Sequence, residues 1–164
     1  MLVEHPEAVE VVRRLSERGL TFATAESSTG GLVSHLIVTV PGASRVFIGG
    51  AVAYGRGPKL GWLRVPVETI ETNGSVHEAT ALAMARGARE ALGVDIAVAE
   101  TGIASDNDNP ERPGGLWCLA IVGPDGYEHA VRHHFEGERQ VRMHQAASQM
   151  LHLVLAYLDE AAET

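Results

Sequence analysis

Short apolar stretches that suit β-strands alternate with segments of helical periodicity along most of this chain. Between Pro6 and Gly19, apolar residues recur at helical spacing and predict a helix over about residues 6–18. The stretch that starts at Thr21 is rich in β-branched and aromatic residues and favours a strand, and residues 32–40 again show helical spacing. This alternation favours α/β architectures, in which strands and helices form separate layers.

The rest of the chain continues the pattern. We expect further strands over residues 45–54, 94–99, 116–122 and 127–135. We expect further helices over about residues 75–92 and 138–158, short helical pieces through Leu63 and after Pro66, and loops over 55–59 and 101–115. Ser75 and Glu78 have the spacing of a capping box, and the GPDG sequence between the last two strands predicts a hairpin.

Helices between early strands and a hairpin late in the chain predict an α/β fold on a mixed sheet. The expected architecture is a three-layer α/β/α sandwich. Because the sequence has 164 residues and no linker or low-complexity tract, we expect residues 1–164 to form a single domain. Functional residues of such folds gather on loops at strand ends, which here are the turn at Ser27, the segment from Tyr54 to Lys59 and the loop at Thr101.

Charge and hydropathy argue against several classes of partner. The formal net charge is −8 and no block of Lys or Arg is present, so no nucleic-acid partner is expected. No apolar run approaches the ~20 residues that span a bilayer, and the first residues lack the basic end of a secretory signal. We therefore expect a cytoplasmic protein without a membrane partner. The only cysteine, Cys118, lies in an apolar run and is interpreted as a buried thiol.

The sequence TFATAESSTGG at residues 21–31 places three consecutive hydroxyl residues between the expected strand and helix. Ser27, Ser28 and Thr29 suit the N-cap of that helix. A serine lifted to the edge of a sheet is also suited to act as a nucleophile, or to bind an anion at the start of the helix. The stretch lacks the G-x-S-x-G pattern of common serine hydrolases, so both interpretations remain open from the residues alone.

Lys59 is the only lysine of the chain and follows an expected strand end. A lysine can take the proton of a serine only when its amine is neutral. From a reference pKa of about 10.4, this requires a fall of roughly 3 units, which burial could produce, with the neighbouring charge of Arg56 as a further aid. The alternative interpretation is a solvated lysine on a loop.

Other polar residues give weaker patterns. Asp106 and Asp108 lack the spacing of a calcium loop, and the adjacent histidines His133 and His134 point to opposite faces of a strand, so no metal site or cofactor is expected. Arg139 and Arg142 lie three residues apart on the last expected helix. They suit either a shared anion site or ordinary solvated charges.

The chain resembles the C-terminal domain of competence-damage-inducible CinA proteins over nearly its whole length. The resemblance rests on six motifs in order, namely AESSTGG at 25–31, PGAS at 41–44, AVAYGRGPK at 51–59, GSVHE at 74–78, AVAETGIA at 97–104 and ERPGGLW at 111–117. It implies the fold of that domain. It also implies a nicotinamide-nucleotide amidase, a carbon–nitrogen hydrolase of pyridine-nucleotide salvage that converts nicotinamide mononucleotide to nicotinate mononucleotide and ammonia.

By the same resemblance, Ser27 is the nucleophile and Lys59 is its base. Backbone N–H groups around residues 29–31 or 101–102 would hold the oxyanion. The implied substrate-binding residues are Thr29, Gly30, Gly31, Tyr54, Thr101, Gly102 and Arg139, with Tyr54 at the pyridine ring and Arg139 at the phosphate. The partners implied are a small-molecule nucleotide substrate and further copies of the chain in a homo-oligomer. The alternative is a catalytically silent relative that binds a nucleotide or a protein.

The chain departs from the family pattern around the expected pocket. It has Gly49 where the family commonly has arginine, and the residues 55–58 before the lysine differ from the usual Ser-Asn-Glu-Ala. After Ile103 and Ala104, the usual Gly-Pro is Ser105 and Asp106, and the tip of the loop is one residue shorter. These changes alter the pocket wall rather than the Ser27 and Lys59 pair.

Overall fold

Five strands form one sheet in the order β2-β1-β3-β4-β5 in the computed structural model, which describes residues 5–163. The strands are Phe22–Glu26 (β1), Phe47–Val52 (β2), Ile96–Gly102 (β3), Leu116–Val122 (β4) and Glu128–His134 (β5). β1 is parallel to both β2 and β3, whereas β4 is antiparallel to both β3 and β5. The predicted mixed sheet is therefore confirmed.

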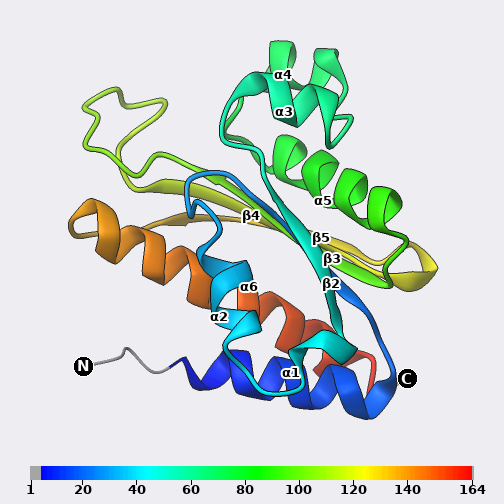
Figure 1. Cartoon of the computed structure of the whole chain (residues 1–164). Coiled ribbons are helices and arrows are strands. Elements are labelled where there is room, and N and C mark those ends of the chain that lie inside the picture. The colour runs from blue at the N-terminus through cyan, green and yellow to red at the C-terminus, as the bar shows by residue number, and fades with distance from the viewer. Residues whose placement is uncertain (1–4, 164) are drawn as a thin grey trace.

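Helices cover both faces of this sheet, as Figure 1 shows. They are Pro6–Arg18 (α1), Leu32–Val38 (α2), Arg56–Gly61 (α3), Val67–Asn73 (α4), Glu78–Leu92 (α5) and Arg139–Glu160 (α6). Short 3-10 turns lie at Ala43–Arg45 (η1) and Pro124–Gly126 (η2). α1, α2 and α6 lie on one face, and α3, α4 and α5 lie on the other (Figure 1). The predicted three-layer α/β/α sandwich is confirmed.

The two cores differ in the size of their strand residues. Alternate residues of β1 and β3 point to opposite faces of the sheet, so Phe22, Ile96 and Val98 pack on one side and small alanines pack on the other. The large residues meet α1 and α6, whose apolar stripes follow the predicted spacing. The alanines meet the alanine-rich face of α5 and allow that helix to approach the sheet closely.

Several local predictions hold in this fold. α1 ends at Gly19, which is left-handed with φ 65° as expected of a helix C-cap. The stripe of α6 is buried at Ala147, Met150, Leu151, Val154 and Leu158, and Met143 is half-buried. The Cys118 thiol is buried, and burial raises its pKa to about 12. The interpretation of this residue as part of the core is confirmed.

Three local predictions are wrong. Residues 55–59 are not a loop, because α3 begins at Arg56, and Pro58 fits its first turn, where a missing N–H costs little. The cap of α5 is His77, whose Nδ1 accepts from the N–H of Ala79, so Ser75 is not the N-cap. The loop expected from residue 101 starts later, because pairing with β4 extends β3 through Gly102.

Candidate active site

Ser27 lies at the carboxyl end of β1, in the turn that leads to α2. The parallel strands β1 and β2 end at the same edge of the sheet, and the N–H of Ala53 donates to the carbonyl of Glu26 at 2.7 Å. The chain then enters α3, which carries Lys59 back toward this edge. The predicted nucleophile and the predicted base are thereby brought into contact.

The Lys59 amine lies 2.9 Å from the Ser27 hydroxyl oxygen. Its other two contacts are the carbonyl oxygens of Ala53 at 2.7 Å and Tyr54 at 3.1 Å. Ser27 is 3% exposed and Lys59 is 2% exposed, so the interpretation of Lys59 as a solvated loop residue is wrong. The contact is made inside the protein rather than in water.

The contacts of the amine also fix how a neutral Lys59 would be oriented. Burial lowers the pKa of Lys59, and the charge of Glu100 opposes this effect. A neutral amine has two N–H groups and one lone pair. The carbonyls of Ala53 and Tyr54 can only accept, so they take the two N–H groups and leave the lone pair for the Ser27 hydroxyl. In that state the serine donates its proton to Lys59, as a general-base pair requires.

The hydroxyl residues of this turn do not cap α2. Gly31 occupies the N-cap position with φ 97° and no side-chain cap. The carboxylate of Glu26 instead accepts from the N–H groups of Val33 at 3.0 Å and Ser34 at 2.8 Å. The predicted capping role of Ser27, Ser28 and Thr29 is wrong, because a glutamate at the end of β1 already satisfies the start of the helix.

A second buried carboxyl, that of Glu100 on β3, accepts hydrogen bonds from the backbone of the turn. It accepts from the backbone N–H groups of Ser27 at 2.5 Å and Thr29 at 2.9 Å, and from the Trp117 indole N–H at 2.5 Å. Burial raises the pKa of Glu100. Sequence reasoning missed both Glu26 and Glu100. The available signal was a glutamate directly after each of two short apolar stretches, where a buried carboxylate needs compensating hydrogen bonds.

Two N–H groups of the turn are available for an oxyanion. The N–H of Thr29 donates to Glu100, and the N–H of Gly30 donates to the carbonyl of Ser27 at 3.1 Å. Within residues 5–163, the N–H groups of Ser28 and Gly31 have no hydrogen-bond partner. The N–H that follows the nucleophile is a common oxyanion donor. Of the expected donors at residues 29–31, only the N–H of Gly31 stays unpaired in the described part of the chain, and the N–H of Ser28, which lies outside that segment, adds a second candidate.

Thr101 and Gly102 support the turn from β3. The Thr101 hydroxyl donates to the carbonyl of Ser75 at 2.8 Å, and the Gly102 carbonyl accepts from the Ser28 hydroxyl at 2.6 Å. A Cβ on Gly102 would overlap the indole of Trp117. These contacts give both residues a structural role, and the substrate contacts that the resemblance implied for them stay a prediction.

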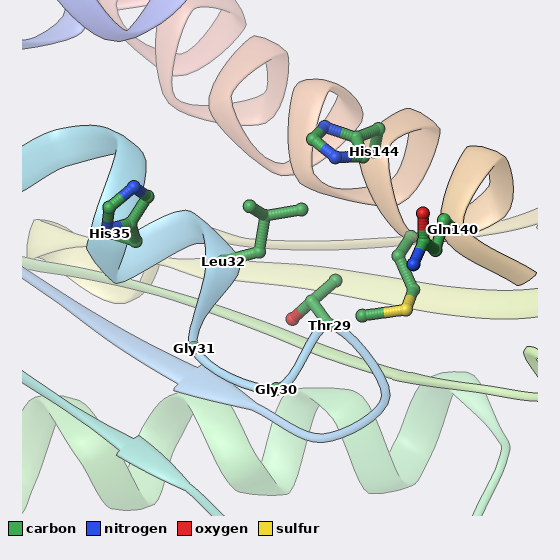
Figure 2. Close-up of a pocket in the computed structure, with 8 residues that line it drawn as sticks. Thr29, Gly30, Gly31, Leu32, His35, Gln140 and His144 are labelled. Carbon is green, nitrogen blue, oxygen red and sulfur yellow. The ribbon is translucent and has the colours of Figure 1, made fainter. Parts of the chain in front are cut away.

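A pocket of about 450 Å³ opens between the turn and the first turns of α6. Figure 2 shows Thr29, Gly30 and Gly31 on one side of it and Gln140 and His144 on the other. The lining is completed by Leu32, His35 and Met143. Three predicted substrate-binding residues therefore line one pocket, but Ser27 and Lys59 are not among its lining residues.

The remaining predicted residues differ in exposure. The Tyr54 side chain is 64% exposed, while its carbonyl holds Lys59. Arg139 is exposed at the start of α6 and makes no ion pair or side-chain hydrogen bond within residues 5–163. Arg142 is buried and donates to the carbonyls of Phe135 at 3.2 Å and Ala104 at 3.1 Å. It also pairs with Asp106 at 3.0 Å. The two arginines do not form a shared anion site.

Residues 5–163 contain neither a metal-binding cluster nor a membrane-spanning helix. No group of three or more His, Cys, Asp or Glu side chains in this part of the chain is arranged to hold a metal ion. None of its helices is both long and apolar enough to cross a membrane.

Comparison with known proteins identifies the relatives of this chain. The family model described as the CinA C-terminal domain matches residues 4–158. A CinA-like protein of Syntrophotalea carbinolica is 40% identical over 152 residues, which are 92% of this chain and 37% of the relative. A putative competence-damage inducible protein of Symbiobacterium thermophilum is 49% identical over 119 residues, which are 72% of this chain and 28% of the relative. The chain thus spans about a third of the length of these relatives.

Solved structures show the same fold. A CinA-superfamily protein of Klebsiella pneumoniae superimposes with a TM-score of 0.90 at 27% identity, covering 95% of this chain and 98% of that one. The competence/damage inducible protein of Agrobacterium tumefaciens has a TM-score of 0.87 at 32% identity, covering 97% of this chain and 99% of that one. In both cases nearly all of the solved chain aligns with this one.

Proposed function

This chain belongs to the CinA C-terminal domain family, and we propose that it is an amidohydrolase that uses Ser27 as nucleophile and Lys59 as base. The proposed substrate is nicotinamide mononucleotide, which the enzyme hydrolyses to nicotinate mononucleotide and ammonia. The observation that carries the proposal is the 2.9 Å contact between the Lys59 amine and the Ser27 hydroxyl. Family membership alone does not assign this activity, and the contact supplies the chemistry for it.

In the first half of the reaction, the Ser27 oxygen attacks the carboxamide carbon while its proton passes to Lys59. The tetrahedral intermediate collapses when the C–N bond breaks. Lys59 returns the proton to the departing nitrogen, which leaves as ammonia. Ser27 is then esterified to the nicotinate carbonyl, and the Lys59 amine is again neutral.

In the second half, a water molecule replaces the amide nitrogen. Lys59 takes a proton from this water as its oxygen attacks the ester carbon, and the C–O bond to Ser27 breaks. The proton passes from Lys59 to the Ser27 oxygen, and nicotinate mononucleotide is released. The N–H groups of Ser28 and Gly31 would stabilise the oxyanion in both halves.

A pocket beside the Ser27 turn supports a nucleotide substrate, although Ser27 and Lys59 do not line it. The pocket lined by Thr29, Gly30 and Gly31 has a volume within the usual range for small-molecule sites, about 300–1,000 Å³. Arg139 directly precedes Gln140, which lines this pocket, and its exposed guanidinium is free to bind a phosphate. The exposed Tyr54 ring lies on the segment that holds Lys59 and is proposed to orient the pyridine ring.

The test is ammonia release from nicotinamide mononucleotide by the purified protein. The Ser27→Ala and Lys59→Ala variants should each lose at least about 10³-fold in kcat. Ser28→Ala is the matched control, because its hydroxyl donates to Gly102 and not to Lys59. No ammonia from the native protein would refute the amidase proposal. Activity that survives Ser27→Ala would refute the mechanism.

The alternative is a catalytically silent relative that binds a nucleotide or a protein partner. It is favoured by the small exposed fractions of Ser27 and Lys59 and by their absence from the pocket lining. It predicts that nicotinamide mononucleotide raises the melting temperature of the protein without releasing ammonia. Binding together with ammonia release would exclude it.

A further inference from the structure

Two glutamates lie in one buried region next to the Ser27 turn. The side chains of Glu26 on β1 and Glu100 on β3 are both fully buried. Neither makes an ion pair within residues 5–163. A buried carboxylate is costly unless a positive charge or a full set of hydrogen-bond donors compensates it. Here hydrogen-bond donors supply the compensation.

Each carboxyl receives three hydrogen bonds, and every one that comes from an N–H group has a fixed direction. Glu26 accepts from the N–H groups of Val33 and Ser34 and from the Ser34 hydroxyl at 2.7 Å. That hydroxyl can in turn accept from Thr24 at 2.8 Å. Glu100 accepts from two N–H groups of the turn and from an indole N–H, as described above. All these partners are neutral, and Lys59 acts on Glu100 only through its charge.

The Thr29 hydroxyl lies between the two carboxyls. Its oxygen is 2.8 Å from Glu26 Oε2 and 2.8 Å from Glu100 Oε1. A hydroxyl has one hydrogen and can donate it to only one of these oxygens. If both glutamates were ionised, the other contact would bring two oxygens within hydrogen-bond distance with no hydrogen between them. One additional proton removes this conflict.

We propose that Glu26 and Glu100 share one additional proton across the Thr29 hydroxyl, so that the pair carries a single negative charge. In one arrangement Glu100 donates to the Thr29 oxygen, and Thr29 donates to Glu26. In the reverse arrangement Glu26 donates to the Thr29 oxygen, and Thr29 donates to Glu100. The two arrangements interconvert when two hydrogens move along the hydrogen bonds from one carboxyl through Thr29 to the other. Thr29 and Glu100 are positioning residues in this scheme, because neither touches the reacting atoms.

The surrounding donors explain why both positions are glutamates. Burial raises the pKa of Glu100, which agrees with a neutral acid at this position. A glutamine would be the usual neutral replacement, but its NH₂ group can only donate. Every carboxyl oxygen of Glu26 and Glu100 faces at least one N–H group. A protonated carboxyl oxygen can donate to Thr29 and still accept, which an amide nitrogen cannot do.

The shared proton also bears on Lys59, and this step rests on the proposed function. A charged Lys59 beside two ionised glutamates carries the same net charge as a neutral Lys59 beside a pair that holds one proton. Lys59 can therefore become the neutral base without changing the charge of the buried region. An ionised Glu100 would instead raise the pKa of Lys59 and oppose this change.

The test is carbon NMR of the substrate-free protein with ¹³C-labelled glutamate side-chain carboxyls. At pH 7 one proton should be present on the pair, so its carboxyl signals should lie away from the ionised position that exposed glutamates show. When the pH is raised, the signals of Glu26 and Glu100 should move together with a single midpoint. Two ionised signals at pH 7, or a titration confined to one glutamate, would overturn the proposal.

Thr29 variants provide the matched comparison. Thr29→Ser keeps the hydroxyl and should keep the common midpoint. Thr29→Val keeps the shape but removes the connection, so the titration should become confined to one carboxyl. A common midpoint in folded Thr29→Val would overturn the role of the hydroxyl. If this variant does not fold, the titration of the native protein still tests whether the two glutamates share a proton. Because no substrate is used, a protein without amidase activity could still show the shared proton.

Discussion

The Lys59 amine and the Ser27 hydroxyl lie 2.9 Å apart although 32 positions separate them in the chain. The parallel pairing of β1 and β2 brings the two strand ends together, and α3 then carries Lys59 back over the turn. Two carbonyls hold the remaining hydrogens of the amine, so a neutral lysine directs its lone pair at the serine. This geometry leads to predictions about rate, stability and binding.

The amidase rate should rise with pH. Only a neutral Lys59 accepts the Ser27 proton, and burial lowers the pKa of Lys59 below its usual value near 10.4. At pH values below the lowered pKa the amine is charged and kcat/KM should fall about tenfold per pH unit. The measurement is ammonia release at low nicotinamide mononucleotide concentration over a range of pH. Lys59→Arg, which stays charged, should be inactive at every pH, and an active Lys59→Arg would contradict the mechanism.

Trp117→Phe should destabilise the protein by about 2–3 kcal/mol, because it removes the indole N–H that donates to Glu100 and leaves a small cavity. Trp62→Phe is the matched control, since that side chain is 63% exposed and should change stability by less than about 0.5 kcal/mol. Urea unfolding of both variants measures the difference. Equal effects would argue against the hydrogen bond to Glu100.

Gly102→Ala should cost about 1–3 kcal/mol, since the added Cβ would overlap the Trp117 indole next to the Ser28 contact. Gly57→Ala is the control in α3, where a Cβ meets no atom within 4 Å, and it should be neutral or stabilising by up to about 1 kcal/mol. Thermal unfolding followed by circular dichroism compares the two. A stable Gly102→Ala protein would show that the strand can shift at this point.

The two arginines of α6 should separate binding from stability. Arg142→Gln should lower stability by about 1–3 kcal/mol, because the buried guanidinium holds the carbonyls of Phe135 and Ala104. Arg139→Gln should leave unfolding unchanged and raise KM for nicotinamide mononucleotide, with kcat little affected. Steady-state kinetics and urea unfolding on both proteins provide the comparison. An unchanged KM in Arg139→Gln would remove this residue from the phosphate site.

Much of the fold could be predicted from the residues. The periodicity of α1 and α6, the β-branched start of β1 and the GPDG hairpin are local signals, and the structure confirms each element within a few residues. The predictions failed at short segments, where one local signal was chosen over another. Glycine and proline at 55–58 suggested a loop, but the segment forms the first turn of α3. Ser75 had the spacing of a cap, but His77 caps α5.

The candidate site was predicted less completely. The residues alone left Ser27 open between cap and nucleophile, and left Lys59 open between solvent and burial. The residues alone made Lys59 a candidate base for the serine, and the resemblance to a family then assigned the two as a pair. Helical spacing did not distinguish buried Arg142 from exposed Arg139, because both lie at the start of one helix. Glu26 and Glu100 were not identified, since a single glutamate after a short apolar stretch resembles the exposed residue at an ordinary strand end.

The sequence by itself determined the order of strands and helices, the mixed sheet and the edge at which polar residues gather, because these follow from short-range periodicity and turn chemistry. Tertiary structure alone decided which polar groups are buried and what each one faces. The pKa of Lys59 and the contacts of Thr29 with two carboxyls both depend on packing between distant segments. Burial and hydrogen-bond partners set the charge of a side chain, and a linear sequence contains neither.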